Sequence, residues 1–248
     1  MIEPDSFMSH LIELRNRLVR ALIVVGAAFL ILVYWAKDIY HIISAPMLAQ
    51  LPEGVKMIAT EITSPFFIPF KVTFLAAFVL ALPYVLYQVW AFVAPGLYVH
   101  EKKFVGPLIV ISTLLFLLGM AFAYFLVFPT VFEVMQAFTP EGVNWMPDIG
   151  TYLTFVLNMF LAFGVTFEVP VVVFLLVKMG IVSVAKLKEV RPYVVVGAFV
   201  VAAVVTPPDV TSQLLLAIPL CVLYECGLFV SRWIEKPEEA KTESGTAA

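Results

Sequence analysis

Long apolar runs alternate with short polar segments along almost the whole chain. A helix needs about 20 apolar residues to cross the hydrocarbon core of a bilayer, within a range of about 17–25. Six runs reach or approach that length, and they cover residues 18–36, 72–94, 104–128, 152–177, 193–206 and 210–230. The pattern predicts an all-α, polytopic membrane protein with six transmembrane helices.

The fifth run is the shortest, with 14 residues at 193–206. A helix of that length rises about 21 Å, less than the roughly 30 Å of the hydrocarbon core. A helix is still predicted, because Arg191 and the sequence "TPPD" bound a continuous run of β-branched and small apolar residues. We expect local thinning of the bilayer, or shelter by neighbouring helices.

Two of the connecting segments are long enough to hold structure of their own. Residues 37–71 contain "ISAPML" and "ITSPFF", which predicts short helices or a cap over one end of the bundle. Residues 129–150 contain "TVFEVMQAF", which predicts another ordered segment. The tail from Glu235 has almost no apolar content, a composition typical of disorder. We expect a six-helix transmembrane domain at 1–234 and a disordered cytoplasmic tail at 235–248.

Lys and Arg are distributed unequally between the two sides of the predicted bundle. Twelve lie at the termini and in the 95–103 and 178–191 segments: Arg15, Arg17, Arg20, Lys102, Lys103, Lys178, Lys186, Lys188, Arg191, Arg232, Lys236 and Lys241. The other side has three: Lys37, Lys56 and Lys71. Since basic residues accumulate on the cytoplasmic side, both termini are predicted to be cytoplasmic.

Composition supports the membrane assignment and limits the chemistry. Hydrophobic residues make up 62% of the chain, charged residues 13%, and the mean hydropathy is +1.01. Cys221 and Cys226 lie five positions apart on one predicted helix, which is incompatible with a disulfide. No His/Cys cluster has metal spacing, and the three histidines lie in separate segments. We expect no enzyme, no metal, no cofactor and no nucleic-acid partner.

Glu168 is an ionisable residue within the fourth run. A charged carboxylate in the middle of a bilayer costs a few kcal/mol, so such a residue is usually neutral, paired or in a cavity. Pro170 deprives the carbonyl of Thr166 of its usual helical partner, and Gly164 leaves space on the same face. These features favour a polar notch with a function. The alternative is a neutral glutamic acid that bonds to a neighbouring helix for packing alone.

Further polar residues lie near the ends of the predicted spans. Asp209 or Thr211 could cap the sixth helix, whereas Gln213 lies about one turn inside it and favours an interhelical hydrogen bond. Thr206 closes the fifth run. Glu225 lies near the other end of the sixth helix, where its side chain could extend to the interface.

The sequence "HLIELRNR" predicts an amphipathic turn on the cytoplasmic side. His10, Glu13 and Arg17 share one face, and the spacing of Glu13 and Arg17 predicts an ion pair. Glu101 lies beside two lysines in "GLYVHEKK". From spacing alone, both segments are typical of solvated surfaces.

Longer motifs resemble one family. They are "HLIELRNRL", "SPFFIPFK", "YQVWAFVAPGLYVHEKK", "GMAFAYFLVFP", "FGVTFEVPVVVFLL" and "RPYVVVGAFVVAAVVTPPDVTSQLLLAIPLCVLYE". Together they resemble the TatC family, core receptors of the twin-arginine translocation pathway, from about residue 8 to residue 233. The resemblance implies a bacterial inner-membrane protein that binds the twin-arginine signal peptides of folded precursors, with export driven by the proton-motive force.

The resemblance also implies roles for particular residues. The acidic contacts of the signal peptide map onto Glu13 and Glu101, with His10 and Leu97 beside them. Glu168 maps onto the intramembrane acid of the family. The surface for single-span TatA- and TatB-type partners maps onto the fifth and sixth helices at Thr206, Asp209 and Gln213. The family further implies several copies of the chain in one complex.

Two other functions remain open from the residues alone. A proton-coupled secondary transporter would use Glu168 as its relay carboxyl, and it would usually need a second buried ionisable residue, for which Glu225 is the candidate. An assembly scaffold without substrate recognition would leave Glu13 and Glu101 without a role.

Overall fold

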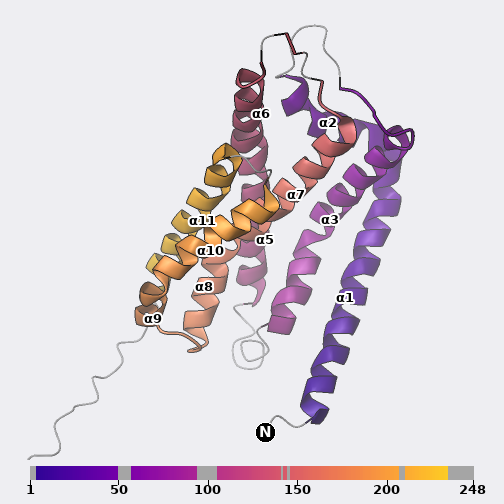
Figure 1. Ribbon diagram of the computed structural model, residues 1–248. Coiled ribbons are helices and arrows are strands. Elements are labelled where there is room, and N and C mark those ends of the chain that lie inside the picture. The colour runs from indigo at the N-terminus through magenta and orange to yellow at the C-terminus, as the bar shows by residue number, and fades with distance from the viewer. Residues whose placement is uncertain are drawn as a thin grey trace, which may run out of the picture.

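The computed structural model of the protein describes residues 4–49, 57–93, 105–140, 142–143, 146–206 and 210–233. The helices run back and forth between two ends of an elongated bundle (Figure 1). We call the end where residues 4–17 lie the N-terminal end. The opposite end, with residues 57–63 and 146–149, is the cap end. The predicted disordered tail, 235–248, lies outside the described residues.

The helices follow one another along the chain in the order of the apolar runs. Their bounds are α1 Pro4–Leu32, η1 Val33–Trp35, α2 Ala36–Leu48, α3 Ser64–Val93, α5 Val105–Phe122, η3 Ala123–Val127, α6 Phe128–Ala137, α7 Ile149–Phe167, α8 Val169–Lys178, α9 Val184–Glu189, α10 Arg191–Val205 and α11 Val210–Ser231. Within the described residues, five helical stretches are long and apolar enough to cross a membrane, and α10 is a shorter apolar helix. The six predicted spans, of which the fifth is the short one, are thereby accounted for.

Several helices extend beyond the apolar runs that predicted them. α1 begins at Pro4, because the amphipathic turn continues directly into the first apolar run. The third pass continues through the π-helical turn η3 into α6, so the ordered segment predicted at "TVFEVMQAF" is a helical extension of this pass. The cap end is formed by α2 together with the loops before α3 and α7 (Figure 1). A parallel backbone bridge between Ile58 and Asp148 connects those two loops.

The helices approach closely where small residues face a neighbouring backbone. α1 packs against α3, α5 against α7, and α8 against α11. A Cβ added to Gly119 on α5 would lie 2.5 Å from the carbonyl oxygen of Phe163 on α7. A Cβ added to Gly227 on α11 would lie 2.9 Å from the Cα of Pro170 on α8. These two glycines therefore set how closely the helices cross, and the main apolar core fills the space between α3, α6, α7 and α11.

Candidate functional site

The predicted ion pair of α1 is present and is joined to α3. The Nε and Nη2 atoms of Arg17 both donate to Oε1 of Glu13, at 2.9 and 2.6 Å. The Nη1 atom of Arg17 donates to Oε1 of Gln88 on α3, at 3.3 Å. The ring of His10 stacks on Phe92 with 4.3 Å between the ring centroids. One face of α1 is thus attached to the last two turns of α3.

Glu13 remains accessible despite its ion pair. Its side chain is 44% exposed, whereas that of Arg17 is 23% exposed. Both donors of Arg17 use the same carboxylate oxygen, and no residue in the described part of the chain donates to the other one. Glu13 can therefore accept a further donor from solvent or from a ligand. Leu97 and Glu101, the other predicted residues of this site, lie outside the described residues.

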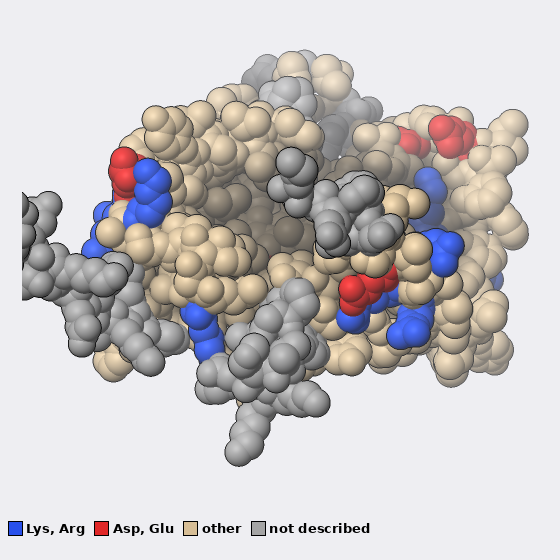
Figure 2. All heavy atoms as spheres, turned by 90° about the horizontal axis from the view of Figure 1, so that it is seen from below, with Lys and Arg blue, Asp and Glu red and all other residues tan. Residues whose placement is uncertain are grey.

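Figure 2 shows the N-terminal end of the molecule in space-filling form. Charged side chains of both signs gather at two opposite sides of this face, and a hollow lined by uncharged described residues lies between them. Two further ion pairs of described residues lie at α9 to α11. Lys186 pairs with Glu189 at 2.9 Å, and Arg191 pairs with Glu225 at 2.6 Å. The side chain of Glu225, which was expected to extend to the interface, thus forms an ion pair with the first residue of α10.

Glu168 lies at the break between α7 and α8. Its backbone N–H donates to the carbonyl of Val165, and α8 begins at the next residue, Val169. The carbonyl of Glu168 then accepts from the backbone N–H of Val171 in α8. The predicted interruption by Pro170 is therefore present. Glu168 is only 7% exposed, so the polar notch that the sequence favoured is not open to the surface of this chain. The space beside Gly164 is filled by the ring of Phe116 on α5.

A chain of hydrogen bonds connects Glu168 to two other helices. The indole N–H of Trp90 on α3 donates to Oγ of Ser112 on α5, at 2.9 Å. The Ser112 hydroxyl donates to Oε2 of Glu168, at 2.7 Å. Ser112 is fully buried, and Oε1 of Glu168 is buried without a hydrogen-bond partner in the described part of the chain. The site therefore has capacity for one more donor.

Replacing Ser112 with alanine is expected to lower the free energy of unfolding by about 1–3 kcal/mol, because the Trp90 N–H and the Glu168 carboxyl group would both lose their partner in a buried site. Thermal unfolding of the purified variant measures the effect. Thr113→Ala is the matched control, since this hydroxyl bonds only within its own helix, to the carbonyl of Ile109. Equal stability of the two variants would show that the connection contributes nothing.

The predicted docking residues are only partly exposed. The Gln213 amide donates to the carbonyl of Phe199 at 3.2 Å, which confirms the expected hydrogen bond between α11 and α10. Thr206 is 6% exposed, and its hydroxyl donates to the carbonyl of Ala202 in its own helix. Asp209 lies outside the described residues. Cys221 and Cys226 are both free, as their spacing predicted.

Trp90, Ser112 and Gln88 were not identified from the sequence. The available signal was weak, because Ser112 and Gln88 are single uncharged polar residues within long apolar runs. Such residues often bond across helices in membranes. Their partners depend on how the helices are rotated, which one sequence does not specify.

Asp148 caps the N-terminus of α7 and joins it to the loop before α3. Its Oδ1 accepts from the backbone N–H groups of Gly150 and Thr151, and Oδ2 accepts from the N–H and hydroxyl of Thr60. These bonds hold the pKa of the Asp148 carboxyl well below its usual value, and the bond from the Thr151 N–H contributes most. The ionised carboxylate is therefore the form that stabilises this loop.

Asp148→Asn is expected to lower the midpoint of thermal unfolding, because an amide group cannot accept at both positions. Since the folded-state pKa is lower than the unfolded value near 3.9, the stabilisation is complete above about pH 5. It is lost as the pH falls below about 4 toward the folded-state pKa. Measured midpoints should differ most between pH 5 and 8 and converge in acid. Asp38→Asn, at an exposed position of α2, is the control, and a difference that grows in acid would contradict the assignment.

The fold and these sites define a class of protein, a multi-pass α-helical membrane protein with an accessible carboxylate at one end and a buried one between its helices. The family model described as "Sec-independent protein translocase protein (TatC)" matches residues 9–219. The chain belongs to the TatC family.

Relatives and solved structures agree with this membership. The Sec-independent protein translocase protein TatC of Escherichia coli (strain K12) is 55% identical over 231 residues, which is 93% of this chain and 90% of the relative. TatC of Azotobacter chroococcum mcd 1 is 54% identical over 98% of this chain and 97% of the relative. A crystal structure of the "Twin Arginine Translocase Receptor- TatC" matches with a TM-score of 0.81 and 39% identity, over 92% of this chain and 100% of that one. These names describe protein translocation, and they do not support a proton-coupled transporter.

Proposed function

We propose that this chain is the membrane receptor of a twin-arginine translocase, and that it binds the signal peptides of folded precursors at its N-terminal end. The observation that carries the proposal is the state of Glu13, which is half-exposed, held by a guanidinium and still able to accept on one oxygen. The similar crystal structure, which is that of a twin-arginine translocase receptor, supports the same role. The proposed contacts are Glu13, Glu101, His10 and Leu97.

The pairing of Arg17 with Glu13 illustrates why arginine is the proposed ligand. A guanidinium presents several N–H donors in a rigid fork, whereas a lysine ammonium is a compact point charge that cannot reproduce this geometry. The first arginine of a signal peptide can donate to the second oxygen of Glu13 or displace Arg17 from the first. The second arginine would then pair with Glu101 on the neighbouring segment.

The site faces the cytoplasm in this proposal. Twelve of the fifteen Lys and Arg residues are expected on the side of both termini, which supports a cytoplasmic N-terminus and C-terminus in a bacterial inner membrane. Basic residues at this end oppose the approach of cations in general. A placed carboxylate is therefore needed to attract a pair of arginines.

The partner proteins in this proposal are TatA- and TatB-type single-span helices and further copies of this chain. The proposed docking residues are Thr206, Asp209 and Gln213, and the short helix α10 adds exposed valines. Glu168 is proposed as the intramembrane polar site, because it is a buried carboxyl group whose Oε1 has no hydrogen-bond partner in the described part of the chain. Undiminished co-purification of such partners with a Gln213→Leu variant would argue against this surface.

The test of the receptor function uses the purified full chain and a synthetic peptide with two consecutive arginines. The peptide is expected to bind, and replacing both arginines with lysines should weaken binding about 10- to 100-fold, because an ammonium cannot form the bidentate pair of a guanidinium with a carboxylate. Fluorescence anisotropy of a labelled peptide measures both affinities. Equal binding of the two peptides would contradict arginine recognition and would favour an assembly scaffold without substrate recognition.

A further inference from the structure

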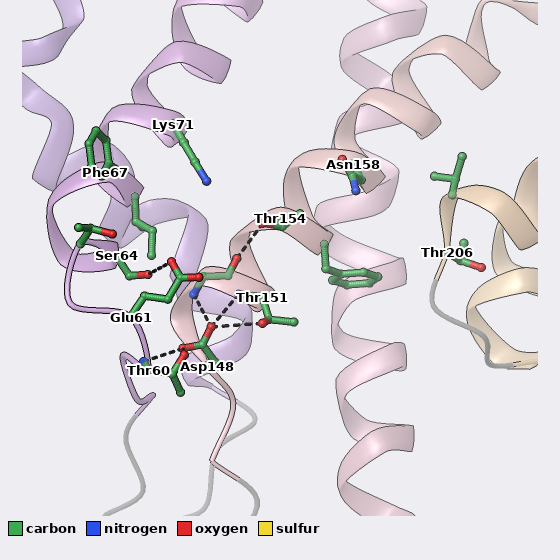
Figure 3. Close-up of a pocket in the computed structure, with 15 residues that line it drawn as sticks. Thr60, Glu61, Ser64, Phe67, Lys71, Asp148, Thr151, Thr154, Asn158 and Thr206 are labelled. Carbon is green, nitrogen blue, oxygen red and sulfur yellow. Dashed lines mark hydrogen bonds between the residues drawn. The ribbon is translucent and has the colours of Figure 1, made fainter.

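A polar pocket opens at the cap end, far along the helices from the proposed signal-peptide site. Its volume is about 600 Å³, and it lies between the start of α3, the start of α7 and the end of α10 (Figure 3). Glu61, Lys71, Asp148 and Asn158 contribute its charged and amide groups. Apolar side chains complete the wall: Phe67, Ile68, Phe155 and Val205.

The charged groups of the pocket are ordered by depth. Glu61 and Asp148 precede the first residues of α3 and α7, so they lie at the rim. Lys71 is seven positions beyond the start of α3 at Ser64, which places it about 10 Å further along the helix axis. Asn158 is similarly deep in α7. Figure 3 shows the Lys71 ammonium directed from α3 toward α7, and it shows Asn158 on α7 further from the loops than the two acids.

The deeper groups have no partner within the part of the chain that the structure describes. Neither Lys71 nor Asn158 takes part in a hydrogen bond or ion pair there, although both are exposed within membrane-spanning helices. A charged or amide side chain at such a position is costly unless it is solvated or bound. At the rim, Asp148 already accepts from Gly150, Thr151 and Thr60. Glu61 accepts only one weak bond, from Ser64 at 3.3 Å, and so has free acceptor capacity.

We propose that this pocket binds the headgroup of a phospholipid that carries a primary ammonium, a phosphoethanolamine headgroup. In a bilayer the phosphate of such a lipid lies nearer the hydrocarbon core, and its ammonium lies further out. The pocket has the complementary order, with Lys71 and Asn158 to donate to the phosphate and Glu61 to accept from the ammonium. Phe67 and Phe155 add apolar walls to the same pocket.

The charge balance of the pocket favours this zwitterion over a simple ion. A plain anion would meet two carboxylates at the rim, and a plain cation would meet the ammonium of Lys71. The depth order follows from the helix positions alone, so it holds whichever side of the membrane the cap end faces. Arginine recognition at the N-terminal end plays no part, and either proposal can therefore fail without the other.

The experiment is native mass spectrometry of the purified full chain with an equimolar mixture of three lipids that have the same acyl chains. Phosphatidylethanolamine is expected to be retained about tenfold over phosphatidylcholine, whose trimethylated nitrogen has no N–H donor, and over phosphatidylglycerol, which has no cation. In the Lys71→Gln and Glu61→Gln variants this roughly tenfold preference for phosphatidylethanolamine should be lost, whereas Lys71→Arg should retain it.

Lys37→Gln is the matched control, because Lys37 is exposed on α2 near the same end and does not line the pocket. Thermal unfolding in the same detergent establishes that each variant is folded. Equal retention of the three lipids, preference for phosphatidylglycerol, or Lys71→Gln and Glu61→Gln variants that behave like the control would each overturn the proposal. Displacement of the lipid by free glycerophosphoethanolamine would support recognition of the headgroup; displacement only by a partner's transmembrane helix would assign the pocket to that protein.

Discussion

Glu13→Ala is expected to weaken binding of a twin-arginine peptide by about 10- to 100-fold. Two effects act in the same direction. The variant loses a charge-assisted acceptor for the incoming guanidinium, and it leaves Arg17 as an uncompensated cation beside the site. Titration of the labelled peptide against the purified variant measures the change in dissociation constant.

The matched control for Glu13 is Glu189→Ala. Glu189 is also an acid at the N-terminal end that pairs with a basic residue of its own helix, Lys186, but it lies on α9, away from α1. Its removal should change peptide affinity less than twofold. If both variants lose affinity equally, the peptide responds to net charge and Glu13 is not a specific contact.

Gly119→Val should have the largest effect on the fold itself. Its Cβ would lie 2.5 Å from the backbone carbonyl oxygen of Phe163, a distance that only a shift of α5 away from α7 can relieve. Overpacking of this kind costs about 1–3 kcal/mol and occasionally more. The same shift would separate Ser112 from Glu168, so we expect a loss at the upper end of that range, measured as thermal unfolding in detergent.

Gly26→Val provides the comparison, because a Cβ at Gly26 on α1 has no other heavy atom within 4 Å. This variant should unfold within about 0.5 kcal/mol of the unaltered chain, the range of substitutions that disturb no contact. Gly119→Val with the stability of Gly26→Val would mean that α5 and α7 do not cross as closely as described.

The sequence was sufficient for features that depend on spacing within one helix. Apolar run length predicted the spans, including the short helix α10, and the i, i+4 spacing predicted the pair of Glu13 and Arg17. Pro170 predicted the helix break at Glu168. An interhelical hydrogen bond of Gln213 was also predicted, because an amide inside a span needs a partner on a neighbouring helix, but its partner on α10 was not.

Features that depend on how helices rotate against one another could not be predicted. Ser112 and Glu168 are 56 positions apart, and their contact requires the particular crossing of α5 and α7. The same crossing buries Glu168, where the sequence favoured a polar notch. The pocket of Lys71 and Glu61 likewise depends on three segments that meet only in the folded chain.

A double-mutant cycle between Glu13 and the signal peptide tests the receptor mechanism most directly. Four affinities are measured, for the unaltered chain and its Glu13→Gln variant, each with the twin-arginine peptide and its twin-lysine counterpart. The account predicts that Glu13→Gln weakens the arginine peptide at least about tenfold and the lysine peptide less than about twofold, a coupling of about 1 kcal/mol or more. Equal losses for the two peptides would contradict direct pairing of Glu13 with an arginine of the signal.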